Sequence, residues 1–293
     1  MATAQQWLSA ARPRTLPAAV APVLVGTGAG IALGGFSWFR GALALVVSLA
    51  LQVGVNYSND YSDGIRGTDA NRVGPLRLVG SGLAAPSTVK FAAFGCYAVA
   101  GVAGLVLAAL TSWWLLPVGV AAVAAAWFYT GGPKPYGYAG FGEIFVFVFF
   151  GLVAVLGTTY VQAERISLNA VIGAIGIGLL ACALLMANNL RDVHTDVTAG
   201  KRTLAVLLGE PLSRRVFVLM IGGAFVAAIG IALTSPWSLL ALLAAPLAVA
   251  PIRQVLGGAR GPALIPVLGA TGRLEFVYAV LLGIGLALEA LPT

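Results

Sequence analysis

Charged residues are scarce in this sequence, and that scarcity excludes an ordinary soluble protein. Only 9% of the 293 residues are Asp, Glu, Lys or Arg, whereas 59% are hydrophobic. A soluble globular domain carries about 25% charged residues. Together with a mean hydropathy of +0.95, this composition indicates an integral membrane protein whose helices face lipid.

Histidine and cysteine are also rare, and their rarity excludes whole classes of site. The sequence has one histidine, His194, and two cysteines, Cys96 and Cys182, which fall in separate apolar stretches. A disulfide framework, or a metal site built from Cys and His, needs partners that are absent here. On a helix His194 would point about 200° away from Asp192, so we expect a surface or supporting role for it rather than catalysis.

Long apolar runs fill most of the chain. A helix needs about 20 apolar residues to cross the hydrocarbon core of a bilayer. Pro246 and Pro251 interrupt one of the candidate runs, at 236–252. We therefore expect an all-α integral membrane protein, a single domain over residues 1–293. Its transmembrane helices, about nine in number, are predicted at 17–36, 41–57, 90–110, 113–130, 143–161, 167–187, 215–233, 236–252 and 272–290.

Basic residues are distributed unequally between the two sides of this predicted topology. With nine spans, Arg40 and Arg165 are the only members of the 17 Lys and Arg residues on one side. Cytoplasmic loops carry the excess of basic residues, so the N-terminus is predicted to be cytoplasmic. The net charge of +7 suits anionic lipid headgroups. Nucleic acid is not an expected partner, because the basic residues are spread over separate loops without a binding motif.

All five aspartates of the chain lie in two short polar clusters. The first is "NDYSDGIRGTD" (59–69), which follows the second apolar stretch, and the other is "NNLRDVHTDVTAGKRT" (188–203), which follows the sixth. If these helices continue into the clusters, residues spaced by three or four share a face. The columns so formed are Asn56, Asn59, Asp60 and Asp63 in the first cluster, and Asn188, Asp192 and Asp196 in the second.

Two facing columns of oxygen ligands predict a magnesium and diphosphate site. Mg²⁺ takes oxygen ligands and is usually bound by one or two carboxylates, waters and substrate phosphates. Gly64 and Gly67 are expected to end the first helix, which would let Asp69 turn back toward the site. The alternative is that these aspartates are solvated residues at helix ends. Ionisable residues that face the interior of a membrane helix bundle, however, mark a functional site by default.

Basic residues flank both clusters and are candidates for holding phosphate oxygens. Arg72 and Arg77 lie in "NRVGPLRLVGSG" (71–82), and Lys201 lies in "GKRT" (200–203). Lys134 stands among glycines, prolines and tyrosines in "YTGGPKPYGYAGFGE" (129–143), which is more constrained than a simple connection. We expect Lys134 to meet the leaving diphosphate. For each basic residue the alternative is that it only marks the cytoplasmic side.

The motifs resemble those of a known family. "NDYSD" and "DVHTDVTAGKRT" are similar to the paired Asp-rich motifs of the UbiA superfamily of intramembrane prenyltransferases. The longer segments, with "ARPRTLPAA" (11–19), resemble the branch that prenylates 1,4-dihydroxy-2-naphthoate. Gly67 stands where the superfamily commonly has a further Asp, and Asp69 follows two residues later. This shift resembles the naphthoate branch. The resemblance implies Lys134, Asp63 and Asp192 as catalytic residues, and its metal ligands carry over, with the adjacent Asp60 added, to Asn59, Asp60, Asp63, Asp192 and Asp196.

The resemblance also implies a reaction and a place in the cell. A UbiA-type bundle with bound Mg²⁺ would transfer a polyprenyl group from polyprenyl diphosphate to 1,4-dihydroxy-2-naphthoate, with loss of diphosphate and CO₂. The product would be demethylmenaquinol, a precursor of menaquinone. The expected location is the inner cell membrane, with several spans in the lipid bilayer and the active site facing the cytoplasm.

Three other hypotheses remain open on the sequence. Within the prenyltransferases, the acceptor could be 4-hydroxybenzoate or a tetrapyrrole. A cation-coupled transporter would carry acids near the middle of the bilayer at broken helices, whereas these acids follow the apolar stretches. A membrane scaffold leaves the clustering of the aspartates unexplained. A CDP-alcohol phosphotransferase is disfavoured, because "DGIRG" (63–67) lacks the D-G-x-x-A-R opening of its motif.

Overall fold

The computed structural model of the protein describes residues 2–68 and 76–290, and every regular element in them is a helix. The all-α prediction is therefore confirmed. The chain runs through α1 (Ala4–Ala10), η1 (Pro13–Thr15), α2 (Pro17–Ala32), α3 (Trp38–Arg66), α4 (Pro86–Leu110), α5 (Leu115–Phe128), η2 (Tyr136–Ala139), α6 (Gly142–Val146), η3 (Phe147–Val153), α7 (Ala154–Ala163), α8 (Leu168–Thr198), α9 (Leu204–Ala232), η4 (Pro236–Ala244), α10 (Ala245–Leu256), η5 (Gly261–Leu264) and α11 (Ile265–Leu288).

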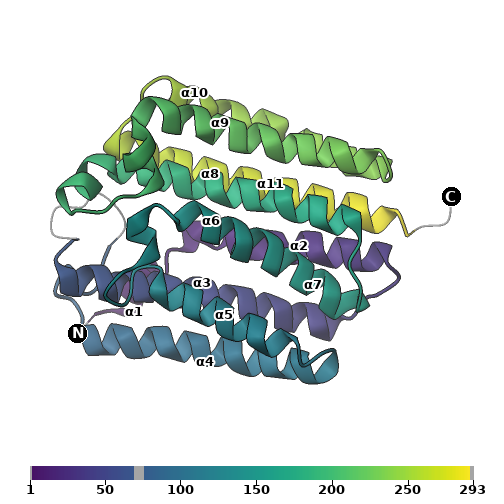
Figure 1. The fold of residues 1–293 in the computed structure, drawn as a ribbon, viewed down its shortest axis with the longest axis horizontal. Coiled ribbons are helices and arrows are strands. Elements are labelled where there is room, and N and C mark those ends of the chain that lie inside the picture. The colour runs from purple at the N-terminus through teal and green to yellow at the C-terminus, as the bar shows by residue number, and fades with distance from the viewer. Residues whose placement is uncertain (1, 69–75, 291–293) are drawn as a thin grey trace.

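The longer helices lie side by side, with their axes close to one common direction (Figure 1). Helix α3 packs along α4, α8 packs along α9, and α2 packs along α11. In Figure 1, α4 forms one edge of the bundle and α9 with α10 forms the opposite edge. The long helices α3 and α8 lie between these two edges, and neighbouring helices bury α8 to a much greater extent than α3.

Seven helices in the described residues are long and apolar enough to cross a membrane, and the count rises to eight if α1–η1 and the bent continuation α2 form one span. Each of the nine apolar stretches expected from the sequence coincides with helix. However, α5 has only 14 residues, about 21 Å at 1.5 Å per residue, against a hydrocarbon core of about 30 Å. The count of nine spans and the side of the N-terminus remain predictions.

Helices α3 and α8 continue beyond their apolar parts into the two polar clusters, as the sequence predicts. Ser37 caps the start of α3 by accepting a hydrogen bond from the backbone N–H of Arg40, and Ser167 caps α8 in the same way. Their 29 and 31 residues give lengths of about 45 Å, which exceed the hydrocarbon core of about 30 Å. The polar ends can thus lie outside the apolar slab.

The end of α3 differs in one detail from the sequence prediction. Gly67 does end the helix, because it adopts the left-handed conformation with φ 70° that favours glycine. Gly64 lies inside the helix instead of ending it. A Cβ atom at Gly64 would lie 2.4 Å from Cγ1 of Val79, so this glycine allows the chain after α3 to pass close to the helix.

Small residues bring other helices into close contact. A Cβ atom at Gly28 of α2 would lie 2.2 Å from the carbonyl oxygen of Gly283 of α11. Between helices in lipid, small residues let two backbones approach and gain van der Waals contact. The main core cluster follows α2, α8, α9 and α11 and is rich in alanine.

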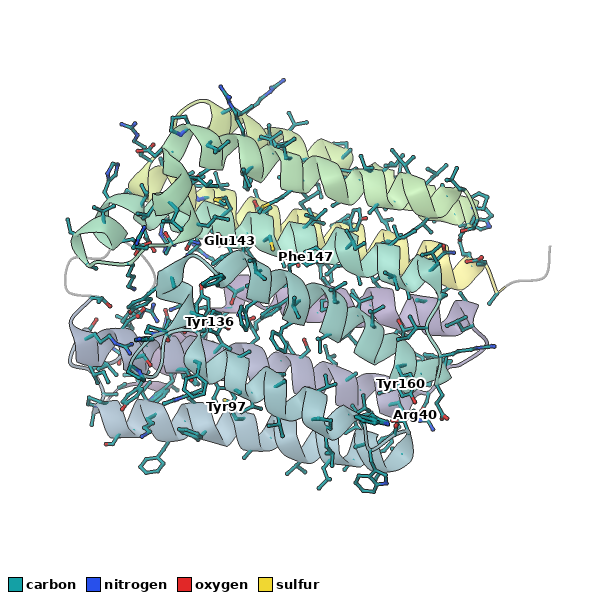
Figure 2. All side chains as sticks on the ribbon, viewed as in Figure 1. Arg40, Tyr97, Tyr136, Glu143, Phe147 and Tyr160 are labelled. Carbon is teal, nitrogen blue, oxygen red and sulfur yellow. The ribbon has the colours of Figure 1, made fainter. Side chains whose placement is uncertain are left out.

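Figure 2 shows Arg40 and Tyr160 near one end of the bundle, and Tyr136 and Tyr97 toward the other.

Candidate active site

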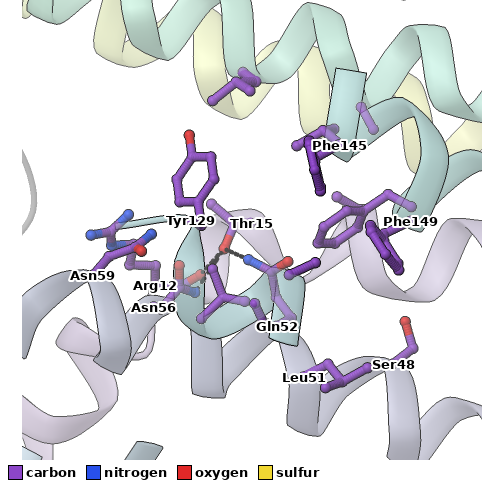
Figure 3. A pocket seen from close by; sticks show the side chains of 18 of the residues that line it. Arg12, Thr15, Ser48, Leu51, Gln52, Asn56, Asn59, Tyr129, Phe145 and Phe149 are labelled. Carbon is purple, nitrogen blue, oxygen red and sulfur yellow. Dashed lines mark hydrogen bonds between the residues drawn. The ribbon is translucent and has the colours of Figure 1, made fainter. Parts of the chain in front are cut away.

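One large cavity connects the two polar clusters with an apolar channel inside the bundle. Its volume is about 840 Å³, in the range of cavities that hold drug-sized ligands. The polar end is lined by Asn59, Asp63, Arg77, Asp192, Asp196 and Lys201, and the apolar end by Val23, Ala44, Leu107, Val118 and Val161. Figure 3 shows Asn56, Asn59 and Arg12 on one side of this space and Phe145 and Phe149 on another.

Helix α3 presents amide and carboxylate groups to the polar end of the cavity. Asn56, Asn59 and Asp63 recur at i, i+3 and i+7 and all line the cavity. The amide of Asn56 is buried and donates to the carbonyl oxygen of Ala11 at 2.9 Å. The Oδ1 atom of Asn59 accepts a hydrogen bond of 2.8 Å from the hydroxyl of Thr130. Both amides are therefore fixed by residues from other segments.

Asp60 does not share this cavity-lining face, although the sequence prediction groups it with the others. It is fully buried and is not among the residues that line the cavity. Its Oδ2 accepts the backbone N–H of Leu78 at 2.7 Å, and its Oδ1 accepts that of Val79 at 3.0 Å. The physical reason is geometric: Asp60 lies about 100° around the helix from Asn59, which turns it toward the chain that follows α3.

Asp63 is the point where three other segments meet. Nη2 of Arg77 lies 3.2 Å from its Oδ2, and Nζ of Lys201 lies 3.4 Å from its Oδ1. The hydroxyl of Tyr138 also donates a hydrogen bond to Oδ1. Because the side chain of Asp63 is buried, these cationic and phenolic partners offset the cost of removing a carboxylate from water.

The second cluster supplies a carboxylate with its own cation. Arg191 is buried and donates two hydrogen bonds to Asp192, from Nε to Oδ1 at 2.7 Å and from Nη2 to Oδ2 at 2.6 Å. This bidentate geometry is the strong form of an arginine–carboxylate pair. Asp196, one helical turn further along α8, also lines the cavity. Sequence reasoning treats Arg191 only as a marker of topology and misses its place in the site.

The segment between α5 and α6 contributes a tyrosine rather than its lysine. Lys134 is exposed and does not line the cavity, whereas Tyr136, Gly137 and Tyr138 do. Nζ of Lys201 lies 4.6 Å from the centre of the Tyr138 ring. The role expected for Lys134 therefore stays a prediction. The aromatic residues of the motif were the signal that could have identified Tyr138.

Two contacts hold Tyr138 in place. The guanidinium of Arg66 donates to the carbonyl oxygens of Thr130 and Gly132 and lies 5.5 Å from the centre of the Tyr138 ring. The backbone N–H of Arg202 donates to the carbonyl oxygen of Tyr138 at 2.9 Å. The ends of α3 and α8 are thus joined through this segment.

The surroundings of Tyr138 keep its hydroxyl protonated. Burial raises the pKa of this phenol, and the nearby carboxylate of Asp63 raises it further. The ordinary pKa of tyrosine is about 10. At neutral pH Tyr138 is therefore a hydrogen-bond donor to Asp63 and not a second negative charge beside it.

The remaining residues singled out in the sequence are His194, Arg72 and Asp69. His194 is exposed, and its Nε2 lies 3.2 Å from Oε1 of Glu210, which agrees with the expected surface role. Arg72, expected to bind diphosphate, and Asp69 lie outside the described residues. Their predicted roles therefore have no structural description.

The donor set fits magnesium better than a softer metal. Carboxylates and amides from α3 and α8 offer oxygen ligands, which Mg²⁺ prefers. Within residues 2–68 and 76–290, no group of three or more His, Cys, Asp or Glu side chains is arranged to hold a metal ion by itself. A metal here would need oxygens from a second source, such as the phosphates of a substrate, which is the usual way that Mg²⁺ is bound.

Comparison with known proteins identifies the family. The model of the UbiA prenyltransferase family matches residues 19–263. The chain belongs to the UbiA prenyltransferase family. It is similar to proteins named 1,4-dihydroxy-2-naphthoate octaprenyltransferase: 53% identical to that of Mycobacterium tuberculosis, over 96% of both chains, and 37% identical to that of Escherichia coli, over 97% of this chain and 96% of the relative.

A solved structure of the family shares the fold. The UbiA homolog from Archaeoglobus fulgidus bound to GPP and Mg²⁺ superposes with a TM-score of 0.70 over 94% of this chain and 99% of that one, at 16% identity. At this identity the likeness shows the fold alone. It confirms the prediction that this family member is a UbiA-type helical bundle.

Proposed function

We propose that this protein transfers a polyprenyl group from polyprenyl diphosphate to 1,4-dihydroxy-2-naphthoate, releasing diphosphate and CO₂ and giving demethylmenaquinol. The observation that carries the proposal is the single cavity that joins a buried carboxylate cluster to an apolar channel. A donor with a charged head and a long apolar tail needs both parts. The relatives named 1,4-dihydroxy-2-naphthoate octaprenyltransferase support the choice of acceptor.

The polar end would hold the diphosphate and Mg²⁺. Asn59 and Asp63 on α3, with Asp192 and Asp196 on α8, are the metal ligands in this proposal, and all four line the cavity. The metal, when bound, supplies positive charge that stabilises the departing diphosphate. Support for Mg²⁺ comes from the oxygen-only donor set and from a family structure described as bound to GPP and Mg²⁺.

Arg77 and Lys201 would neutralise the phosphate oxygens. Both contact Asp63, so they lie where a diphosphate would meet the carboxylates. When the diphosphate binds, these cations could exchange part of their contact with Asp63 for contact with phosphate oxygens, which would leave the carboxylate of Asp63 available to hold Mg²⁺. Positive groups that are already in place cost little reorganisation as the negative charge develops.

The chemistry is an electrophilic substitution on an electron-rich ring. The bond between C1 of the prenyl chain and the diphosphate oxygen breaks, and the oxygen keeps the electron pair. The ring of the dihydroxynaphthoate supplies the pair for the new carbon–carbon bond, and loss of the carboxyl group as CO₂ restores its aromatic character. Apolar and aromatic walls, including Phe145 and Phe149 (Figure 3), would keep water from the cation.

We also propose a location for the protein, on the basis of its apolar composition and its basic residues. We place it in the cell membrane as one domain with several spans, with the polar end of the cavity at the cytoplasmic face. The apolar helices and the bias of basic residues support this orientation, because basic residues gather on the cytoplasmic side. In bacteria with two membranes, this means the inner one.

The proposal is tested by incubating the purified protein with labelled polyprenyl diphosphate, Mg²⁺ and a panel of aromatic acceptors. We expect a prenylated, decarboxylated product with 1,4-dihydroxy-2-naphthoate. Transfer to 4-hydroxybenzoate but not to the naphthoate would contradict the acceptor. No product with any acceptor would contradict the enzymatic function itself.

A further inference from the structure

The carboxylate of Asp60 holds the chain that follows α3. Both of its oxygens accept backbone N–H groups, from Leu78 at 2.7 Å and from Val79 at 3.0 Å. Asp60 and Leu78 have no exposed surface. Two N–H donors on one buried carboxylate form a specific clamp, because hydrogen bonds to a charged acceptor are short and strong.

A second contact, one helical turn along α3, presses the same residues against the helix. The space left by the missing side chain of Gly64 is filled by Val79, whose Cγ1 would lie 2.4 Å from a Cβ atom at that position. Asp60 and Gly64 are four residues apart and thus on one side of the helix. Together, Asp60 and Gly64 fix the distance of residues 78 and 79 from α3 and their position along that helix.

The residue held by this clamp is Arg77. It precedes Leu78 directly, its side chain is buried, and its Nη2 lies 3.2 Å from Oδ2 of Asp63 in the cavity. A backbone shift at Leu78 would move Arg77 with it. The two faces of α3 are therefore coupled: Asp63 faces the cavity, and Asp60 fixes the backbone of the arginine that reaches Asp63.

We propose that Asp60 is a positioning residue that aims Arg77 at the diphosphate site and does not bind the metal. The inference rests on the proposed function only in assigning diphosphate to Arg77. Asp60 has no exposed surface and does not line the cavity, so an ion could reach its oxygens only if the chain at Leu78 and Val79 moved away from α3. Leaving those N–H groups unpaired would carry a large cost.

The first test uses Asp60→Asn with Ser62→Ala as the control. The asparagine keeps one acceptor oxygen and sets an NH₂ group against the other backbone N–H. Ser62 is also buried on α3, does not line the cavity, and its hydroxyl makes no hydrogen bond within the described residues. We expect faster amide hydrogen exchange at Leu78 and Val79 in Asp60→Asn, measured in detergent without Mg²⁺, and little change in Ser62→Ala.

The same variants are then compared for binding of inorganic diphosphate, measured as the inhibition constant in the transfer assay. We expect Asp60→Asn to weaken inhibition by about tenfold, the size of one lost hydrogen bond to a charged group. The Mg²⁺ concentration that gives half-maximal activity should stay close to that of the wild type. A ligand to the metal would show the opposite pattern, with a raised Mg²⁺ requirement.

A double-mutant cycle with Arg77→Ala separates positioning from a general loss of structure. If Asp60 acts through Arg77, adding Asp60→Asn to Arg77→Ala should cause no further loss of diphosphate inhibition, because coupled residues are not additive. Additive losses would overturn the proposal. Unchanged exchange at Leu78 and Val79, or a raised Mg²⁺ requirement, would overturn it as well.

If Asp60→Asn does not fold, Gly64→Ala replaces it in the same measurements. The added methyl group should push Val79 away from α3 while the Asp60 carboxylate stays intact, and it should produce the same weakened inhibition and faster exchange. Normal diphosphate inhibition in Gly64→Ala would contradict the clamp. Failure of the wild type to prenylate the naphthoate would contradict the acceptor only, since hydrogen exchange does not depend on transfer and the diphosphate inhibition constant can be measured with any acceptor of the panel that is prenylated.

Discussion

Lys201 lies with its Nζ 3.4 Å from Oδ1 of Asp63, so the segment after α8 closes onto the end of α3. The same carboxylate is contacted from the other side by Arg77. Asp63 is thus one residue through which the two polar clusters are joined. Substitutions at this junction should separate binding of the donor from maintenance of the fold.

We expect the carboxylates of both helices to be needed for turnover. Asp63→Asn and Asp192→Asn should each lower kcat by at least about a hundredfold, the usual cost of removing one group that stabilises developing charge. A chelator should abolish activity, and added Mg²⁺ should restore it. Initial rates across a Mg²⁺ titration provide the measurement. Near-normal rates for both variants at limiting Mg²⁺ would rule out a metal site shared by the two clusters.

Among the lysines, we expect Lys201 to matter more than Lys134. Lys201→Ala removes a cation from the cavity and should lower kcat/KM for the donor by about tenfold or more, as expected for one charge-assisted contact. Lys134→Ala alters an exposed residue outside the cavity. Arg253→Ala, also exposed, is the matched control for loss of positive charge.

These three variants are compared in membranes at equal protein levels, with cysteine accessibility to check that topology is unchanged. A loss in Lys134→Ala as large as that in Lys201→Ala would restore the role expected for Lys134 from the sequence. It would also imply that this segment moves toward the cavity when the donor binds.

Removing the hydroxyl of Tyr138 should lower turnover without changing the pH range over which the enzyme is active. Tyr138→Phe eliminates the hydrogen bond to Asp63 and should lower turnover by about tenfold, since a bond to a charged acceptor contributes about 1.5–3 kcal/mol. Because the pKa of Tyr138 is raised above its ordinary value of about 10, the wild type should lose no activity through this group below about pH 10. A pH–rate profile from pH 7 to 10 checks both statements, and a drop near pH 9 that is absent from Tyr138→Phe would contradict them.

Filling the apolar end of the cavity should discriminate between donors by length. Gly104 of α4 lines the cavity, and a Cβ atom there would meet nothing within 4 Å. Gly104→Leu should therefore raise KM for long polyprenyl diphosphates more than for geranyl diphosphate. Gly101→Leu is the control, because it lies one turn away with equally open space but outside the cavity. Equal effects on both donors would place the prenyl chain elsewhere.

The sequence was sufficient for the helical class and for most of the two polar columns, because these depend on local spacing, and the resemblance of the motifs was sufficient for the family. Asn59, Asp63, Asp192 and Asp196 line one cavity as their helical period suggests. The side that Asp60 takes could not be predicted, since it depends on where the chain returns after α3. The same applies to Tyr138, which contacts Asp63 only because two segments distant in sequence pack together. It also applies to Arg191, whose contact with the adjacent Asp192 depends on the side-chain rotamer.

The spacing of Asp63 and Arg77 along the chain has a consequence for biosynthesis. They are 14 residues apart, so both are available as soon as α3 and the segment after it have been made. Lys201 is added only after α4 to α8. The nascent chain can therefore neutralise Asp63 with Arg77 before the second half of the site exists, which lowers the cost of holding a carboxylate at the membrane surface. A ribosome-bound fragment that ends before α8 should insert with α3 in its final orientation, and Arg77→Ala should disturb that early step.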